Sequence, residues 1–444
     1  MQRLIYSILL VVSLIAFNAC RSASGGAPAA SLVAPCEIAL AAHPGGAKID
    51  QEIARIQQDI RANARPFQTT ALIEKLGWSF VEKARASFDP GFYKLAEQCA
   101  RCLESKQGEK QAANQALSTP QSIRSAALLL RGHALHNLHR FSEAEKIARE
   151  LVEARGLAYD FGLLGDVLIE QGKTDEAVMA YQKMMEMRPG PQAYSRAAHV
   201  RWLRGDTEGA RALMRMSAQA SGQGDPESAA WAWSKLAIYE LQEGELKRAH
   251  AICDAALELQ SDYAPALLAR GRVLLAENKT GEAVTTLERA AGLNPLPEYQ
   301  WTLADALRAA NRGDDAAKIE SQLAATGPAN DPRTYSVFLA TRGQQLDTAL
   351  RLAEEELKVR RDVYTLDALA WAQAAKGNTA EAWKTMQSAL TLGTVDARLH
   401  LHAATIAAQA GENKQARIYA GKAAKAAVSL LPGERIRLKQ LKFV

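Results

Sequence analysis

Aromatic residues are scarce in this chain of 444 residues, and it has little excess of charge of either sign. Phe, Trp and Tyr make up 6% of the sequence, and 54 basic against 49 acidic side chains give a formal net charge of +5. The two signs are interspersed along the whole chain, whereas a nucleic-acid-binding protein concentrates basic residues on one face. Alanine dominates the long periodic stretches, which favours closely packed helices over a β-sandwich rich in Val, Thr and Tyr. We therefore expect an all-α protein that binds no nucleic acid.

Sequence motifs of enzymes are also lacking. No H-E-x-x-H, G-x-S-x-G or G-x-G-x-x-G occurs. Gly172, Lys173 and Thr174 match the end of a phosphate-binding loop, but Val167 occupies the place of its first glycine. The segment also leads out of a predicted helix, whereas such a loop follows a strand. We expect a protein without catalytic residues and without a cofactor.

Histidines and cysteines are the remaining candidates for metal or redox chemistry. His133, His136 and His139 are spaced by three on one predicted helix, so that they could offer metal ligands or line a surface. No Asp, Glu or Cys joins them nearby, which favours the surface role and predicts no metal site. His400 and His402 are two residues apart and point to different sides of a helix, so they form no site.

Cys99 and Cys102 form a C-x-x-C within a stretch of helical periodicity. No second C-x-x-C accompanies them, and no histidine follows to attach haem. A redox pair, half of a zinc site, buried structural thiols and a disulfide with Cys36 are all possible. Buried thiols are the preferred interpretation, with the disulfide next. Cys253 falls on a predicted core face.

The first thirty residues have the pattern of an export signal. Arg3 precedes an apolar run from Leu4 to Phe17, too short to span a bilayer as a mature helix, and Cys20 follows it. This resembles a bacterial lipoprotein signal, which implies a signal peptide over 1–19 and a lipidated Cys20 with a flexible tether over 20–31. Because Arg21 is not the Asp that often retains such proteins at the inner membrane, the resemblance implies the outer membrane. The alternative is cleavage near Ala23, which gives a soluble periplasmic or secreted protein.

One alanine recurs near the start of a helix along most of the chain, at intervals of 33 or 34 residues apart from one interval of 39. A Gly or Ala stands twelve positions earlier in eight of the nine cases, and Val337 is the exception. A Gly or Asn stands five positions earlier in most of them, where a helix needs a left-handed residue to stop. The nine alanines are Ala144, Ala177, Ala210, Ala249, Ala283, Ala316, Ala349, Ala382 and Ala416.

These residues resemble the tetratricopeptide repeat, a helix-turn-helix unit of 34 residues, most clearly over Tyr159 to Pro189 and Tyr263 to Pro295. The resemblance implies an α-solenoid, a superhelix of nine units over 125–430. Residues 32–122 form an N-terminal helical region with a degenerate repeat in this interpretation. Residues 431–444 are a capping tail, whose basic residues we interpret as a solvated helix face.

In this family the first helix of each unit lines a concave groove, so the resemblance implies which residues a partner would contact. Four of them are tryptophans, which we expect to be exposed, so that Trp202→Ala, Trp301→Ala and Trp371→Ala should shift the melting temperature little. The alternative is that superhelical contacts bury some of these rings as core. The paired Lys and Asn with which some family members grip a terminal carboxylate are lacking. The predicted groove residues are Tyr159, Asp166, Arg196, His199, Trp202, Trp231, Arg272, Trp301, Asp305, Arg308, Tyr364, Asp367 and Trp371.

The sequence therefore predicts a non-enzymatic scaffold lipoprotein on the periplasmic side of a bacterial envelope, with a protein or peptide partner and a lipid anchor in the membrane. Extended concave surfaces of this kind serve binding, although a fold alone fixes no function. A cell-wall or carbohydrate-associated enzyme subunit, or a glycan-binding protein, is the alternative. An assembly factor that acts through its convex face is a third possibility.

Overall fold

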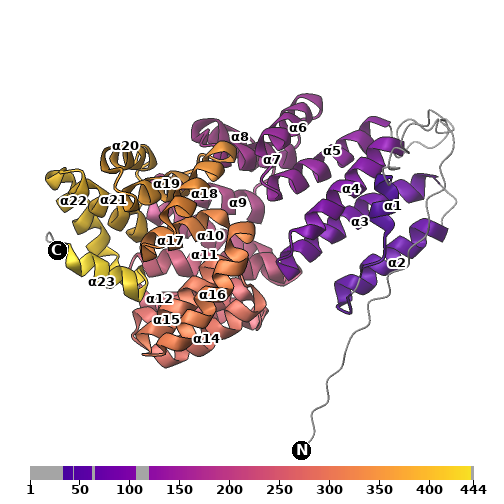
Figure 1. The fold of residues 1–444 in the computed structure, drawn as a ribbon. Helices are drawn as coiled ribbons and strands as arrows, with labels where there is room; N and C mark the ends of the chain where they lie inside the picture. Colours follow the sequence, from indigo (N-terminus) through magenta and orange to yellow (C-terminus); the bar gives the residue numbers. More distant parts are fainter. Residues whose placement is uncertain (1–33, 44, 63–65, 107–119, 442–444) are drawn as a thin grey trace, which may run out of the picture.

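The computed structural model describes residues 34–43, 45–62, 66–106 and 120–441, and its regular elements there are all helices (Figure 1). The predicted signal peptide, Cys20 and the tether lie outside these residues. No helix in the described part of the chain is long and apolar enough to cross a membrane. The all-α fold class predicted from the alanine-rich sequence is confirmed.

Four helices form the N-terminal region. Ile53, Leu76 and Phe80 are fully buried between them, and the region packs onto the rest of the chain because α4 contacts α5. It lies at one end of the molecule in Figure 1. The helices are α1 (Pro35–Leu40), α2 (Lys48–Ala62), α3 (Pro66–Ser87) and α4 (Gly91–Lys106).

A disulfide joins Cys36 of α1 to Cys102 of α4, across 66 residues of sequence. The preferred interpretation of the C-x-x-C as two buried thiols is therefore wrong for Cys102, and the alternative pairing with Cys36 is the one found. Cys99 is a fully buried free thiol, and its pKa is raised by burial. Cys253 is likewise fully buried, with a pKa raised to about 12 by burial, so neither thiol is reactive.

Cys102→Ala should destabilise this N-terminal region by about 2–4 kcal/mol, because the disulfide closes a long loop in the unfolded chain. The loss should be confined to unfolding of α1–α4, since neither cysteine belongs to the helices that follow. Hydrogen exchange of α2 and α3, with and without a reductant, measures it. Cys253→Ala is the matched control for loss of a thiol from the repeat array. Equal protection of α2 and α3 in oxidised and reduced protein would contradict the expectation.

Nine consecutive helix pairs follow, and in each pair the second helix packs antiparallel on the first. The pairs are α5 (Pro120–Asn137) and α6 (Phe141–Ala154), α7 (Ala158–Glu170) and α8 (Thr174–Met187), α9 (Pro191–Leu203) and α10 (Thr207–Ser221), α11 (Pro226–Gln242) and α12 (Leu246–Leu259), α13 (Ala264–Ala276) and α14 (Thr280–Leu293), α15 (Pro297–Ala309) and α16 (Gly313–Asn330), α17 (Pro332–Arg342) and α18 (Leu346–Val359), α19 (Val363–Ala375) and α20 (Thr379–Ala389), and α21 (Ala397–Gln409) and α22 (Asn413–Lys425). A last helix, α23 (Pro432–Gln440), ends the described chain.

The recurring small residues lie where the two helices of a pair cross. All nine marker alanines have an exposed fraction of 0%. At Gly165 a Cβ atom would lie 2.3 Å from the ring of Tyr181, and at Gly271 it would lie 2.5 Å from the side chain of Leu287. Larger residues would therefore push the helices apart, which explains why the repeat keeps Gly or Ala at these positions.

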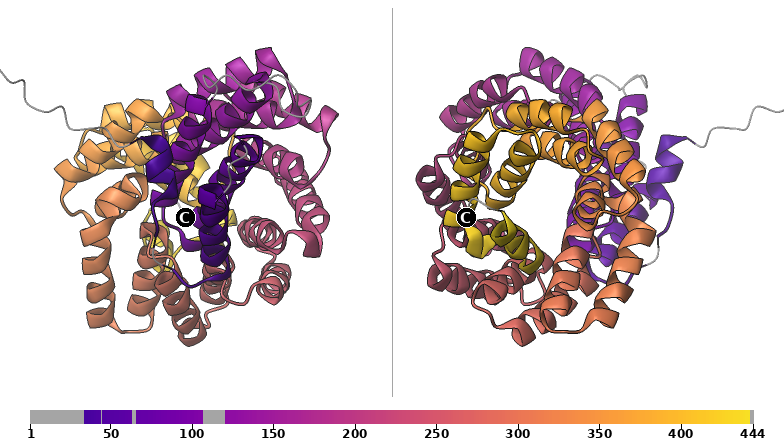
Figure 2. Two further views of the ribbon diagram at one scale, coloured as in Figure 1. Left: turned by 90° about the vertical axis from the view of Figure 1, so that its right-hand side faces the viewer. Right: turned by 60° about the vertical axis from the view of Figure 1, so that its left-hand side comes forward.

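The pairs wind into a superhelix so tight that its successive turns touch (Figure 2). The backbone N–H of Arg361 donates to the carbonyl of Glu170 at 2.8 Å, and the Thr394 hydroxyl donates to the carbonyl of Leu203 at 2.6 Å. Glu170 and Leu203 are the last residues of α7 and α9, whose carbonyls have no partner within the helix. The next turn of the superhelix satisfies them.

Glycine at two of the helix breaks permits this close approach. Gly172 and Gly205 have φ angles of +74° and +76°. Asn also stops helices in this chain, at Asn278 and Asn311, with similar φ angles. At Gly172, however, a Cβ atom would lie 2.8 Å from the carbonyl oxygen of Arg361, and at Gly205 a Cβ would be 2.5 Å from that of Gly393. These two positions therefore exclude any side chain, in addition to requiring a left-handed backbone.

Candidate functional site on the inner face

The first helices of the pairs, α5 to α21 with odd numbers, carry all the groove residues predicted from the sequence. The structure divides these residues into two groups. Those on α7, α9 and the start of α11 keep part of their surface exposed, apart from the buried Trp202, whereas most of those on α13 to α19 are covered by other parts of the chain.

The partly exposed group centres on an ion pair between neighbouring units. The Arg196 guanidinium donates to both oxygens of Asp166, at 2.7 and 2.5 Å, and the Tyr181 hydroxyl donates to the same carboxylate at 3.0 Å. Burial opposes ionisation of Asp166, but Arg196 outweighs it and holds the pKa of Asp166 below its usual value. This bidentate pair fixes two side chains of α7 and α9 in one orientation.

Partly exposed aromatic rings lie on the same helix as Asp166 and on α11, the next first helix after that of Arg196. Tyr159 is 40% exposed and has the Arg188 guanidinium 5.0 Å from its ring. Trp231 is half-buried, with the Lys235 ammonium 5.9 Å from its ring, and His199 is half-buried on α9. Burial is the main cause that lowers the pKa of His199. Aromatic and cationic groups that share a partly exposed face are typical of protein-binding surfaces.

Three of the four predicted groove tryptophans are buried, so the expectation that they are exposed is wrong. Trp202 stacks on Tyr239 at 4.3 Å between ring centroids and donates to the hydroxyl of Tyr364 in the next superhelical turn at 3.2 Å. Trp301 is only 1% exposed. Trp371 stacks on His402 at 4.0 Å and donates to Thr341 at 2.9 Å. The contact between turns and the end of the chain, neither visible in a single repeat, bury these rings.

The remaining predicted residues are engaged within the chain. Asp305 is buried and pairs with Arg342, and Asp367 is buried against the ring of His402 at 2.9 Å. Arg272 is half-buried and donates to the carbonyl of Ser429 at 3.2 Å. Arg308 is exposed and pairs with Glu320. Their role in binding a partner stays a prediction.

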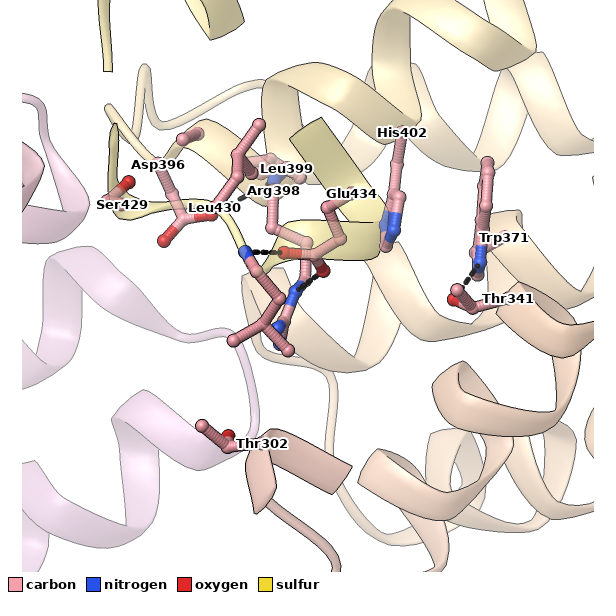
Figure 3. A network of polar contacts seen from close by, with 12 residues as sticks. Thr302, Thr341, Trp371, Asp396, Arg398, Leu399, His402, Ser429, Leu430 and Glu434 are labelled. Atoms are coloured by element: carbon pink, nitrogen blue, oxygen red, sulfur yellow. Dashed lines mark hydrogen bonds and ion pairs between the residues drawn. The ribbon is translucent and has the colours of Figure 1, made fainter. Parts of the chain in front are cut away.

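The segment that covers this part of the inner face is the C-terminal end of the described chain. Figure 3 shows Arg398 of α21 and Glu434 of α23 pointing toward each other, where they form a buried ion pair. The Arg437 guanidinium donates to the carbonyl of Thr341 at 2.8 Å and lies 5.3 Å from the ring of Trp371. The interpretation of the basic tail residues as a solvated face is therefore wrong for Arg437, which is half-buried and whose pKa burial lowers.

Sequence reasoning missed Arg398, His402 and Glu434. The repeat register contained the signal for two of them, because Arg398 stands at the second position of the last unit, like Tyr159 and Trp231 in theirs. His402 stands at the sixth position, like Arg196. No signal within a repeat identifies Glu434, since it lies beyond the last one.

The fit beneath the C-terminal segment leaves polar atoms without partners. Within the described residues, Trp301 Nε1 and Arg272 Nε are buried and have no hydrogen-bond partner. Each buried unpaired group of this kind costs about 1–3 kcal/mol. The C-terminal segment thus covers this part of the inner face, but the described chain leaves two of its buried hydrogen-bond donors unpaired.

His133 and His136 of α5 and His139 of the turn that follows pack against aromatic rings. His133 lies 5.5 Å from Trp78, while His136 and His139 lie 5.6 and 5.5 Å from Phe141, between ring centroids. Among the described residues, no group of three or more His, Cys, Asp or Glu side chains is arranged to hold a metal ion. Burial lowers the pKa of His133 to about 3 and that of His139 to about 4.

Acidification should destabilise the protein below a pH of about 6.5. His400 shows the cause most clearly, because it is 4% exposed and burial lowers its pKa to about 4. In the unfolded chain histidine takes up a proton near pH 6.5, so the unfolded state binds more protons between these two values. The resulting loss of folding stability is absent above pH 6.5 and reaches about 2 kcal/mol at pH 5 for one such histidine.

Urea unfolding at pH 7.5 and pH 5 measures this effect, with His400→Asn as the comparison. The variant should lose less stability than the wild type on acidification, because its side chain does not titrate. Identical losses in the two proteins would show that His400 makes no contribution.

Part of the repeated sequence is matched by models of a known protein family. Models of the tetratricopeptide repeat match residues 163–226 and residues 240–301. The chain contains tetratricopeptide repeats. The first match runs from within α7 to the first residue of α11, and the second runs from the end of α11 into α15. Asp166, Arg196 and His199 fall within the first match, whereas Tyr159 and Trp231 lie outside both.

Solved structures that are similar to this chain include two described as tetratricopeptide repeat proteins, TTC0263 and YrrB. PilF of Pseudomonas aeruginosa is 16% identical, with a TM-score of 0.40 over 50% of this chain and 99% of that one. TTC0263 of Thermus thermophilus is 22% identical, with a TM-score of 0.34 over 44% and 97% of the two chains. YrrB, described as having an unusual peptide-binding site, is 15% identical, with a TM-score of 0.30 over 38% and 86%. No curated protein matches the sequence.

Proposed function

We propose that the protein is a non-enzymatic scaffold that binds a protein or peptide partner on the inner face of its superhelix, on the periplasmic side of a bacterial envelope. The observation that supports it most is the partly exposed group on α7, α9 and α11. There the Asp166–Arg196 pair lies on the same first helices as the partly exposed Tyr159 and His199, Trp231 stands on the next one, and no other part of the described chain covers Tyr159 fully. Aromatic rings around a rigid charge pair supply both contact area and orientation for a peptide.

Capture of partners from membranes tests the binding surface. Tyr159→Ala and Trp231→Ala should each lower recovery of the same partner at least fivefold, because each removes an aromatic contact from the uncovered face. Met179→Ala is the matched control, since Met179 lies on α8 and is 62% exposed. A partner recovered equally by all four proteins would place the binding surface elsewhere, and the proposal would fail.

We further propose that lipid on Cys20 anchors the scaffold, which the pattern of residues 1–30 supports. A tether of Gly, Ser, Ala and Pro would then hold the folded part, which begins at Pro35, away from the membrane. Cys20→Ser should block incorporation of labelled fatty acid. The mass of the mature N-terminus separates lipidated Cys20 from cleavage near Ala23, which would indicate a soluble protein.

A further inference from the structure

The C-terminal segment from Ser429 to Leu438 lies across the inner face, as its contacts show. The Arg435 guanidinium donates to the carbonyl of Leu275 in α13 at 3.2 Å, and a Cβ at Gly433 would lie 3.1 Å from the Asp305 carboxylate in α15. Arg437 reaches α17 and α19, and Glu434 reaches α21. The segment thus contacts the first helices of five successive units, which is the position of a ligand in the groove of a solenoid.

Two kinds of contact hold the segment. Leu430, Leu431 and Leu438 are buried, and Leu430 and Leu438 share a small apolar cluster with side chains of α21 such as Leu401. Toward α13, α17 and α19, Arg435 and Arg437 contact carbonyls and an aromatic ring, and Leu431 belongs to the large core cluster that includes Trp301 of α15. The side chain of Ile436 is 59% exposed and adds nothing to either side. The burial of three leucines and the polar contacts of Arg435 and Arg437 therefore together hold the segment over the groove.

Polar contacts of this kind exchange readily with those of another chain. The segment leaves Trp301 Nε1 and Arg272 Nε unpaired, although both are buried beneath it in the described structure. A ligand that supplied acceptors for these two donors would gain interactions that the segment lacks. The Arg398 guanidinium lies 4.6 Å from the Trp301 ring and pairs with the Glu434 carboxylate of the segment. A ligand that replaced the segment would have to supply a carboxylate in its place.

We propose that this part of the inner face is a binding surface for a helical segment with a carboxylate in its first turn, and that α23 is its resident occupant, which competes with such a segment. The proposal rests on the function proposed above and adds a second surface to it, distinct from that on α7 and α9. An incoming helix must displace α23, whose tether to α22 gives it a high effective concentration. Partner binding at this surface is therefore restrained by the chain itself.

A labelled peptide of residues 427–441 tests the competition on the full-length protein. The double variant Glu434→Gln, Arg437→Gln removes the ion pair with Arg398 and the bond to the Thr341 carbonyl, and should bind the peptide at least tenfold more tightly than the wild type does. A peptide carrying Glu434→Gln should bind that variant at least tenfold more weakly, because it lacks the partner of Arg398. Lys439→Gln, at an exposed position of the same helix, is the matched control and should behave as wild type.

Equal affinity of the wild type and the double variant for the peptide would overturn the proposal, since α23 would then be a permanent cap. Hydrogen exchange of the wild type guards against a variant that fails to fold: the amides of α23 should exchange at least tenfold faster than those of α21, and equal protection would also overturn it. No external partner is needed for either measurement. If the peptide binds as expected but no partner is captured, the proposed function fails and the competition stands.

Discussion

Arg360→Ala should lower the free energy of unfolding by about 3–5 kcal/mol, because it removes one of the two cations, the other being Arg333, from a group of buried and half-buried carboxylates. Arg360 is buried in the loop before α19 and pairs with Glu170 of the preceding superhelical turn. Its guanidinium also lies 3.8 Å from the Glu356 carboxylate and 3.1 Å from that of Asp362. Burial raises the pKa of Glu356, so this carboxylate is already costly to keep ionised.

Urea unfolding and small-angle scattering together measure the effect of Arg360→Ala. Because the ion pair joins two turns, the variant should be both less stable and larger in radius of gyration. Arg351→Ala is the matched control, since Arg351 and Glu355 form a surface pair in which both side chains are about half exposed. Such pairs contribute about 0.5 kcal/mol or less. An Arg360 variant that is no less stable than this control would contradict the description of the contact between turns.

Trp301→Ala should lower the free energy of unfolding by about 3–5 kcal/mol, which is typical when a buried ring is replaced by a methyl group. Trp301 packs edge-on against Phe338 at 5.8 Å and lies beneath Arg398. The sequence alone predicted only a small shift of the melting temperature for this change, so the two accounts differ clearly. Thermal and chemical unfolding of the variant decide between them.

Trp231→Ala is the comparison for Trp301, because both tryptophans were predicted on the same inner face. Trp231 is half-buried, so its loss should change stability much less. Equal stability of the wild type and the Trp301 variant would show that the ring is not part of the packed core.

The repeat, the fold class and the packing of the helix pairs could be predicted from the sequence because each depends on residues close together in it. The marker alanines illustrate this: a small residue every 33 or 34 positions has one packing explanation, and all nine are fully buried. Element positions follow from the same local periodicity and from the Gly and Asn residues that stop the helices.

The candidate site was less predictable, because the exposure of its residues depends on contacts with residues far apart in the sequence. Trp202 is buried partly by Tyr364, and Trp371 is approached by Arg437. A rule derived from one repeat treats every inner-face position alike, so it assigned Trp231, Trp301 and Trp371, at the second, fifth and ninth positions of their units, the same exposure. Gly172 and Gly205 are likewise typical helix stops in the sequence, and only the next turn explains why they cannot carry a side chain.

The contact between successive turns is the central feature of this account, and the amide of Arg361 tests it most directly. This N–H lies in the loop between α18 and α19 and has its partner in Glu170, at the end of α7. If the turns touch, its hydrogen exchange in the native protein should be slowed at least a hundredfold relative to the rate of an unstructured loop. Exchange at the rate of an unstructured loop would contradict the closed superhelix.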